Sequence, residues 1–237
     1  MVFSIQEQTN LFQTFRGIAG DAIRPGGLLL TKKAADQCGF QAGARIADIG
    51  CGPGTTLQYL LHRRKCIACG VDISTQMLSQ CHGLPVIQAD ADNLPFIGEC
   101  LDGIFCECAM SLLALPARAL KEFHRVLRPS GWLVLADIYL RNPQPETAFP
   151  ASPAACLSGA VSRAVRESQI TGCGFEIISW EDHTRYLTEL SARMVWNLGS
   201  RKLLMDLLLP GIDPAETCRK LDALRPGYGG WIARKSE

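Results

Sequence analysis

The glycine-rich segment at residues 48–54 constrains the fold of this chain more than any other feature. It is Asp48-Ile49-Gly50-Cys51-Gly52-Pro53-Gly54, and its first two residues end a short apolar run that begins at Arg45. Gly50 and Gly52 have no Cβ, so the backbone there can turn tightly and lie close to a ligand. A helix expected over residues 55–64 points its N-terminal amides into the same crevice. The segment therefore predicts a strand, a tight turn and a helix with a ligand at the turn.

The rest of the chain repeats this alternation. After residue 43, short apolar runs alternate with amphipathic segments, which is typical of βαβ units and a parallel sheet. We expect a doubly wound α/β fold with a mostly parallel seven-stranded sheet. The strands are expected at residues 45–49, 66–71, 84–88, 101–106, 132–138, 175–180 and 227–235. An antiparallel last strand is common on such sheets, but the sequence leaves its direction open.

The expected helices connect and flank these strands. They are predicted at residues 4–16, 28–38, 55–64, 74–81, from Pro116, at 154–171 and at 182–209, the last interrupted near Gly199-Ser200 and stopped by Pro210. A proline-rich loop at residues 142–153 cannot form regular structure.

The length of 237 residues suits one α/β domain with insertions. We expect a single domain over residues 1–237, with an N-terminal helical cap at 1–40 and a ligand-binding core at 41–140. Residues 141–237 are expected to supply a substrate-side lid, helices and the last strands. The segments before residue 40 and from 142 to 171 are expected to cover the pocket and set specificity.

The charge pattern excludes some partners. The formal net charge is +1, and the densest basic run, residues 62–65, falls where the macrodipole of an ending helix favours cations. This disfavours nucleic acid as a partner. The N-terminal segment does not have the order of a signal peptide, and no apolar run approaches the ~20 residues that span a bilayer. We expect no membrane partner and a cytoplasmic location; the oligomeric state stays open.

Eleven cysteines are the most unusual feature of the composition. An odd number without an export signal argues against a disulfide framework. Cys66-x-x-Cys69 and Cys106-x-Cys108 look like fragments of metal sites, but both lie in apolar runs where cysteine packs as a small hydrophobe. Because the four-ligand spacing of a closed zinc site is missing, we expect no metal.

The glycine spacing and Asp48 argue against a dinucleotide. A dinucleotide turn has the pattern Gly-x-Gly-x-x-Gly, whereas here the third glycine is at position 54 and Thr55 takes its place. Asp48 lies at the mouth of the turn, where a carboxylate would repel a pyrophosphate but suits an ammonium group. The pattern therefore favours an amino-acid-bearing nucleoside over NAD.

Two further acids follow the next two strands. Asp72 comes about 20 residues after the first glycine, where an acid is placed to accept the hydroxyls of a ribose. An alternative is that Asp72 caps the next helix, a role that Ser74 can also fill. Asp90 can reach the exocyclic amine of an adenine while the Ala91 amide meets a ring nitrogen; as an alternative, Asp90 is an ordinary turn residue.

Taken together, these motifs resemble those of the class I S-adenosylmethionine (SAM)-dependent methyltransferases. Within that class they are similar to the small-molecule branch typified by quinone-biosynthesis and arsenite methyltransferases. The resemblance covers about residues 40–140 and rests on the segments 48–54, 71–74, 90–96, 101–104 and 122–131. It implies a Rossmann-like fold, SAM as cofactor, a small-molecule methyl acceptor and an enzyme. The cofactor-binding residues it implies are Asp48, Gly50, Cys51, Gly52, Asp72, Ile73, Asp90, Ala91 and Glu107.

The resemblance implies in-line displacement of a methyl group from a sulfonium, in a pocket that excludes water. Cys108, Tyr139 and His183 are the candidates on the acceptor side, and His183 is the weak candidate for a catalytic base; a capping or buried hydrogen-bonded role is its alternative. Arg24 is a candidate for the SAM carboxylate, or a surface residue.

The part of the chain after Gly172 resembles the tail of the arsenite enzymes more loosely. The arsenite enzymes hold arsenic through a set of cysteine thiolates. Here the cysteines at 66, 69 and 81 fall in or near core elements, which disfavours arsenite as substrate. Two other functions stay open: a SAM-binding regulatory or scaffold protein without turnover, and, opposed by the glycine spacing and Asp48, an NAD(P)-dependent oxidoreductase.

Overall fold

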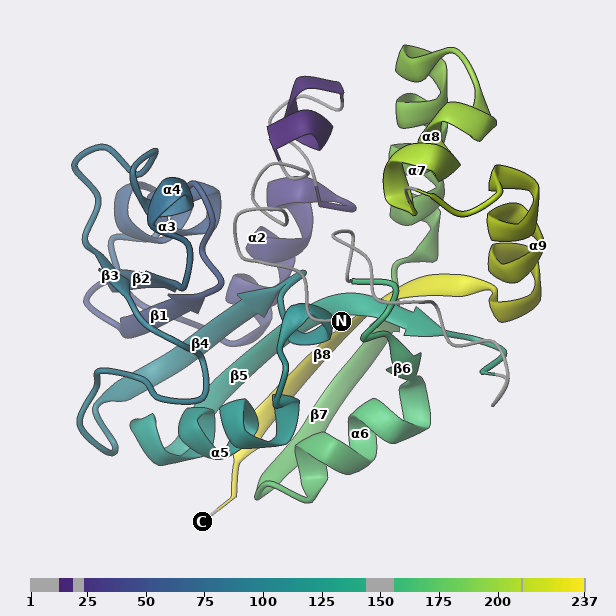
Figure 1. Cartoon of the computed structure of the whole chain (residues 1–237). Helices are drawn as coiled ribbons and strands as arrows, with labels where there is room; N and C mark the ends of the chain where they lie inside the picture. Colours follow the sequence, from purple (N-terminus) through teal and green to yellow (C-terminus); the bar gives the residue numbers. More distant parts are fainter. Residues whose placement is uncertain (1–12, 19–23, 144–155, 210, 237) are drawn as a thin grey trace.

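The computed structural model describes residues 13–18, 24–143, 156–209 and 211–236. Its eight strands form one sheet (Figure 1). They are β1 (Arg45–Ile49), β2 (Ile67–Asp72), β3 (Val86–Gln88), β4 (Leu101–Glu107), β5 (Leu127–Leu140), β6 (Val161–Ser162), β7 (Phe175–Asp182) and β8 (Pro226–Lys235). The helices are α2 (Gly27–Gln37), α3 (Thr55–His62), α4 (Thr75–Leu78), α5 (Pro116–Val126), α6 (Arg163–Thr171), α7 (Thr184–Leu198), α8 (Arg201–Leu208) and α9 (Pro214–Leu224), with a 3₁₀ turn, η1 (Met110–Leu112).

The order of the strands is the one expected for a doubly wound sheet. It runs β3-β2-β1-β4-β5-β8-β7, and the first five strands of the chain, β1 to β5, are parallel to one another. The last strand, β8, is antiparallel to both β5 and β7. The eighth strand, absent from the seven predicted, is the two-residue β6, which pairs with the end of β5. The chain order reverses between β1 and β4, and in open α/β sheets ligands bind at such a point, beyond the carboxyl ends of the strands.

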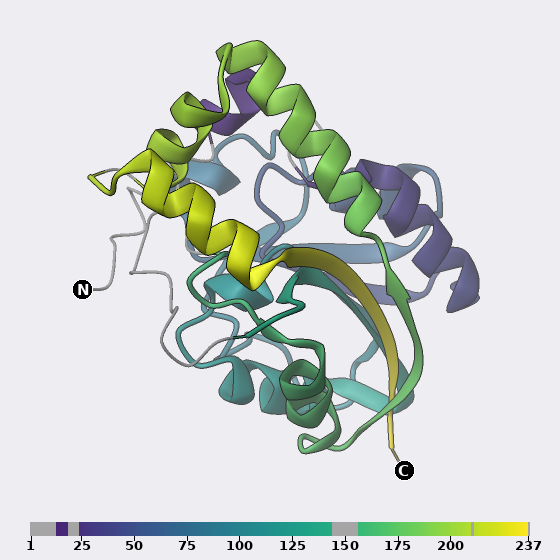
Figure 2. The ribbon, with the colours of Figure 1, turned by 90° about the vertical axis from the view of Figure 1, so that its right-hand side faces the viewer.

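Two layers of helices bury the faces of the sheet. Successive side chains of β4 alternate between them, since strand residues point to opposite faces. Ile104 packs with Leu120 and Phe123 of α5, whereas Phe105 packs with Leu57 of α3 on the other face. Helices α7, α8 and α9 cover neither face; they stand together beyond one end of the sheet (Figures 1 and 2).

Some predicted boundaries were wrong, for local reasons. The helix expected from residue 154 begins at Arg163, because β6 precedes it and the Ser162 side chain accepts a hydrogen bond from the Val165 N–H. The fifth strand begins at Leu127 rather than 132, with Ser130 in a left-handed conformation within it.

Other predicted segments were missed, shortened or lie outside the described residues. Helix α9 was not predicted at all. Of the helix expected at 4–16, residues 13–16 are described and helical; residues 144–153 of the expected proline-rich loop lie outside the described residues. In the part that the structure describes, no helix has the length and apolar character that crossing a membrane requires.

Candidate active site

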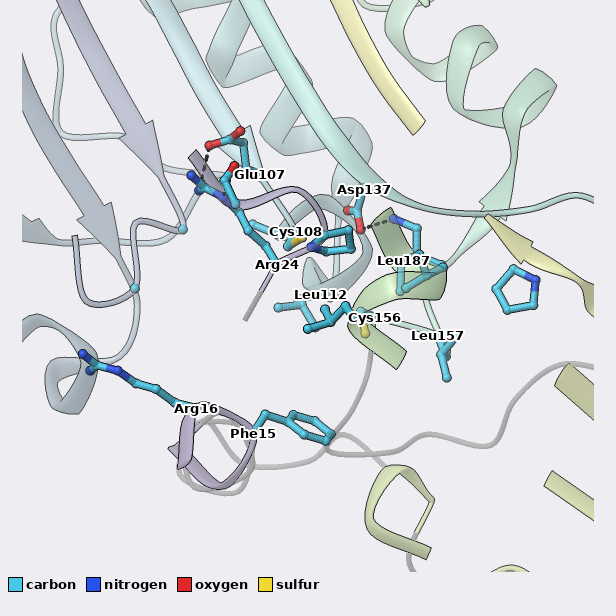
Figure 3. Close-up of a pocket in the computed structure, with 18 of the residues that line it drawn as sticks. Phe15, Arg16, Arg24, Glu107, Cys108, Leu112, Asp137, Cys156, Leu157 and Leu187 are labelled. Carbon is cyan, nitrogen blue, oxygen red and sulfur yellow. Dashed lines mark hydrogen bonds and ion pairs between the residues drawn. The ribbon is translucent and has the colours of Figure 1, made fainter. Parts of the chain in front are cut away.

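A cavity of about 1260 Å³ lies where β1, β2, β4 and β5 end, and helices α7 and α8 form its opposite wall. Figure 3 shows part of it, with Arg24, Glu107, Cys108 and Leu187 of α7 among the residues that line it. All nine residues predicted to bind the cofactor line this one cavity. Strands that are far apart in sequence thus bring them together.

The glycine-rich turn lies tightly against its neighbours. The amides of Gly50 and Cys51 both donate to the carbonyl of Val71, at 2.8 and 3.1 Å. Gly50 has φ +70°, and a Cβ there would lie 2.5 Å from the Cβ of Ala109. Only glycine satisfies both the backbone conformation and the close approach at this position.

Asp72 binds the turn rather than capping a helix. Its Oδ2 accepts from the Gly52 N–H at 2.8 Å and its Oδ1 from the Ser74 N–H at 2.9 Å. The Ser74 side chain itself caps α4. Burial raises the pKa of Asp72, against the lowering effect of these N–H groups. A carboxylate has about four acceptor positions, so two remain for hydroxyl groups in the cavity.

Asp48 is buried at the base of the cavity with an unsatisfied oxygen. Asp48 is 2% exposed, and its Oδ2 has no hydrogen-bond partner among the described residues. Burial raises the pKa of Asp48 to about 7, and the negative charge of Glu107 adds to this while Arg24 opposes it. A buried polar atom without a partner in a native site calls for an explanation, and a ligand with a donor or a positive charge supplies one.

Arg24 and Glu107 form a buried ion pair beside Asp48. Arg24 Nη1 lies 2.8 Å from Glu107 Oε2, and the hydroxyls of Thr31 and Thr56 both donate to the same carboxylate. Burial acts to lower the pKa of Arg24, but the charges of Glu107 and Asp48 outweigh it and raise that pKa. The sequence left two roles open for Arg24, a contact with the SAM carboxylate or a position on the surface. In the structure Arg24 lines the cavity.

The three candidates for the adenine side of the site are Ile73, Asp90 and Ala91. Asp90 is exposed, and its side-chain Oδ1 accepts a long hydrogen bond, 3.3 Å, from the Asp92 N–H. Ile73 is 42% exposed although it is a large apolar residue. Together with the buried Ala91 they line the cavity, so an apolar ring can lie against Ile73 with a polar edge toward Asp90.

The three candidates on the acceptor side, Cys108, Tyr139 and His183, lie in different places in the structure. Cys108 lines the cavity, has φ +56°, and its Sγ lies 3.1 Å from the Tyr228 hydroxyl; burial raises the pKa of this thiol. Tyr139 donates to Asp182 instead and does not line the cavity. His183 lines, with Glu181, a second, small pocket that shares Glu107 with the cavity, and desolvation there lowers the pKa of His183.

Asp137 is a cavity residue that the sequence analysis missed. It is 1% exposed, accepts hydrogen bonds of 2.7 Å from the Ser111 amide and hydroxyl, and feels the positive charge of the buried Arg166. It comes near the end of the predicted strand 132–138. That position is the signal that identified Asp48, Asp72 and Asp90, and it would have identified Asp137 as well.

The cysteines form no metal centre in the described part of the chain. None of the eleven, all of which lie in the described residues, is in a disulfide bond, and no group of three or more His, Cys, Asp or Glu residues there could hold a metal ion. Cys66 and Cys106 are buried, as expected for small hydrophobic residues.

Comparisons with known proteins agree with this geometry. Residues 47–135 match the family model "Methyltransferase domain". An uncharacterized methyltransferase, YodH, of Bacillus subtilis is 32% identical over 137 residues, which is 54% of this chain and 57% of that protein. A fatty-acid O-methyltransferase of Mycolicibacterium smegmatis is 31% identical over 44% of this chain and 40% of that protein. The chain thus spans about half the length of the curated relatives it matches.

Solved structures share the fold at low sequence identity. Phosphoethanolamine N-methyltransferase 2 of Haemonchus contortus, in complex with SAM, superimposes with a TM-score of 0.75 at 18% identity, over 97% of this chain and 57% of that one. The [4+2]-cyclase SpnF gives 0.72 at 21% identity, over 97% and 93%. These likenesses establish the Rossmann-like architecture.

The fold, the glycine-rich turn and the matched family model define the class of protein: this chain carries a class I SAM-dependent methyltransferase domain. The cofactor of that class is SAM. The comparisons do not single out the quinone-biosynthesis and arsenite branch, and they do not favour an NAD(P)-dependent oxidoreductase.

Proposed function

We propose that this chain binds SAM in the cavity at the strand ends and transfers its methyl group to a small-molecule acceptor. The observation that carries the proposal is the set of acids at the ends of successive strands. Asp48, Asp72 and Asp90 line one cavity beside the glycine-rich turn.

The residues fit the parts of the cofactor in order along the sheet. Asp72 has acceptor positions left for the ribose hydroxyls, and Asp90 and the Ala91 amide take the polar edge of the adenine. The unsatisfied Oδ2 of Asp48 suits the α-ammonium group. Cys51 and Gly52 of the turn lie between these two ends.

The Arg24–Glu107 pair suits the amino-acid end of the same ligand. A guanidinium has five N–H donors, and those of Arg24 bind Glu107, Thr31, Thr56 and the Gly27 carbonyl. One N–H remains for a carboxylate, while Glu107 adds negative charge beside the ammonium.

When bound, SAM supplies an electrophilic methyl group on a sulfonium. The chain's own part is to orient the acceptor toward that methyl and to exclude water, which removes most of the entropic cost of a two-substrate reaction. Cys108, which follows β4, and Asp137 of β5 both line the cavity, and we assign them to the acceptor side. His183, which lies outside the cavity, is not needed in this mechanism.

The first experiment is a calorimetric titration with S-adenosylhomocysteine, SAM and NADH. We expect the two sulfur nucleosides to bind and NADH not to bind. Asp72→Asn should weaken their affinity about tenfold to a hundredfold, the loss expected for one charged hydrogen-bonding group. Asp102→Asn is the control, since Asp102 binds the Arg45 amide at the opposite end of the sheet.

The second experiment separates an enzyme from a binding protein without turnover. Release of S-adenosylhomocysteine is measured with a panel of thiols, amines, phenols and carboxylic acids. Turnover with one acceptor class supports the proposal. If SAM binds but no class of acceptor is methylated, the non-enzymatic alternative is correct.

A further inference from the structure

The cavity is larger than a typical site for a single ligand. Ligand sites are typically about 300–1,000 Å³, whereas this cavity measures about 1260 Å³. The nine cofactor candidates all lie between residues 48 and 107, on β1, β2 and β4 and in the loops that follow β1, β2 and β3. The space beneath α7 and α8 is therefore left for the acceptor.

Apolar side chains form the wall of that second half. Leu190 and Met194 of α7 pack with Leu204 and Met205 of α8 in one buried cluster, and all four line the cavity. Phe15, from the helical residues 13–18, packs against the same cluster and also lines the cavity, next to Arg16 (Figure 3). The hydroxyl residues Thr188 and Ser191 of α7 also line this half, but its large side chains are apolar, so it favours an apolar body.

The charges at the outer edge of this half are positive. Three arginines, Arg141, Arg201 and Arg225, line it with a single acid, Asp222. Asp222 is bound to Arg201 at 2.8 Å, which leaves Arg141 and Arg225. Asp182 also acts electrostatically on Arg141, but it does not line the cavity.

Arg141 and Arg225 lie side by side. Arg141 Nε donates to the Arg225 backbone carbonyl at 3.1 Å. Among the described residues nothing is bound to the Arg225 guanidinium. Both arginines line the cavity, and guanidinium groups bind carboxylate and phosphate through paired hydrogen bonds, so an anionic group at this end of the cavity can bind to them.

The distance between the two ends of this half defines the length of a ligand. Arg141 follows Asp137 by four residues along an extended strand, which corresponds to about 13 Å at 3.3 Å per residue. Asp137 acts electrostatically on Cys108 at the inner end. An acceptor that reaches from one end to the other must be elongated.

We propose that the acceptor is an elongated apolar molecule with an anionic end group, carboxylate or phosphate, held by Arg141 and Arg225 with its methylated atom toward Cys108 and Asp137. This inference rests on the proposed function. It adds the chemical class of the acceptor and two residues that select it.

The test is a binding titration of the protein saturated with S-adenosylhomocysteine, using laurate, dodecyl phosphate and dodecanol below their aggregation limits. We expect the two anions to bind more tightly than dodecanol. Arg225→Gln and Arg141→Gln should each weaken the anions about tenfold, the effect of one charged hydrogen-bonding group, and leave dodecanol unchanged. Whichever anion loses more affinity identifies the end group.

Two control variants make the outcome specific. Arg219→Gln removes an exposed arginine of α9 that does not line the cavity and should change nothing. Met205→Trp fills the apolar half and should weaken all three probes without changing the affinity for S-adenosylhomocysteine. The inference is overturned if that nucleoside binds but the anions bind no better than dodecanol, or if Arg225→Gln and Arg219→Gln behave alike. If the nucleoside itself does not bind, the proposed function fails instead.

Discussion

Arg24 and Glu107 form an ion pair, 2.8 Å between Nη1 and Oε2, that joins the segment before α2 to the end of β4. The Glu107 side chain is 3% exposed and that of Arg24 is 18% exposed, so water does little to solvate either charge. Thr31 of α2 and Thr56 of α3 hold the same carboxylate. This pair therefore connects the N-terminal helices to the cofactor end of the cavity.

Removing one partner of this pair should destabilise the fold. Arg24→Met leaves a buried carboxylate without its cation, and we expect the free energy of unfolding to fall by about 3–5 kcal/mol. The double variant Arg24→Met with Glu107→Gln removes both charges and should be more stable than Arg24→Met alone. Denaturant unfolding measures both.

An exposed arginine gives the matched control. Arg118 is 71% exposed and lies 4.0 Å from Asp92, so Arg118→Met should change stability by no more than about 0.5 kcal/mol. Equal losses at positions 24 and 118, or a double variant less stable than Arg24→Met, would contradict the buried pair.

Gly50 is predicted to be intolerant of a side chain because of Ala109. Gly50→Ala adds the strain of a left-handed residue, about 1–2 kcal/mol, and a contact of 2.5 Å with the Ala109 Cβ. Gly43→Ala has the strain alone, since φ is +85° there and nothing lies within 4 Å of the new Cβ. We expect Gly50→Ala to be the more destabilising by about 1–3 kcal/mol.

A double-mutant cycle isolates that contact. Adding Ala109→Gly to Gly50→Ala should recover the difference between the two glycine sites in chemical denaturation. If Ala109→Gly destabilises Gly50→Ala as much as it does the unchanged protein, the close approach does not determine the choice of glycine.

The sequence predicted the parts of the fold that are determined locally. The strand at Arg45–Ile49 was predicted to the residue, because its apolar run is short and a glycine turn ends it. The break between α7 and α8 was found because Gly199, at φ +85°, ends α7 and the Ser200 side chain caps α8.

The parts that were missed depend on packing or on signals that were overlooked. Helix α9 has a clear start in the sequence, since Asp213 accepts from the Ala215 N–H and Pro214 is its first residue. By contrast, no local signal pairs Arg24 with Glu107: these residues are far apart in the chain, and they meet only when the segment before α2 packs against the end of β4. Strand β6 likewise exists only because the end of β5 offers it a partner.

His183 is expected to be dispensable for cofactor binding. It lies in the small pocket with Glu181 and Trp231, and it precedes α7 without a side-chain capping bond. His183→Ala should leave the affinity for S-adenosylhomocysteine within about twofold, well under the tenfold that 1.4 kcal/mol represents. A loss comparable to that of Asp72→Asn would show that the histidine acts on the cavity after all.

The raised pKa of Asp48 makes a prediction about pH. Without a ligand, burial raises the pKa of this carboxyl to about 7, so near neutral pH a large fraction of it is protonated. A cationic ligand binds the ionised form better, and its binding must therefore lower the pKa of Asp48 and release a proton. The affinity for SAM should rise as the pH increases from about 6 to about 7.5, below the α-amino pKa of about 7.7–8.0.

Calorimetry in buffers of different ionisation enthalpy measures that proton directly. Asp48→Asn cannot ionise, so it should bind SAM more weakly and lose the proton release that distinguishes the unchanged protein over this range. Asp72→Asn is the comparison, because it weakens binding but leaves Asp48 free to titrate, and proton release should persist. A pH dependence that survives in Asp48→Asn and disappears in Asp72→Asn would assign the titration to the ribose-side acid and would remove the role given to the unsatisfied oxygen of Asp48.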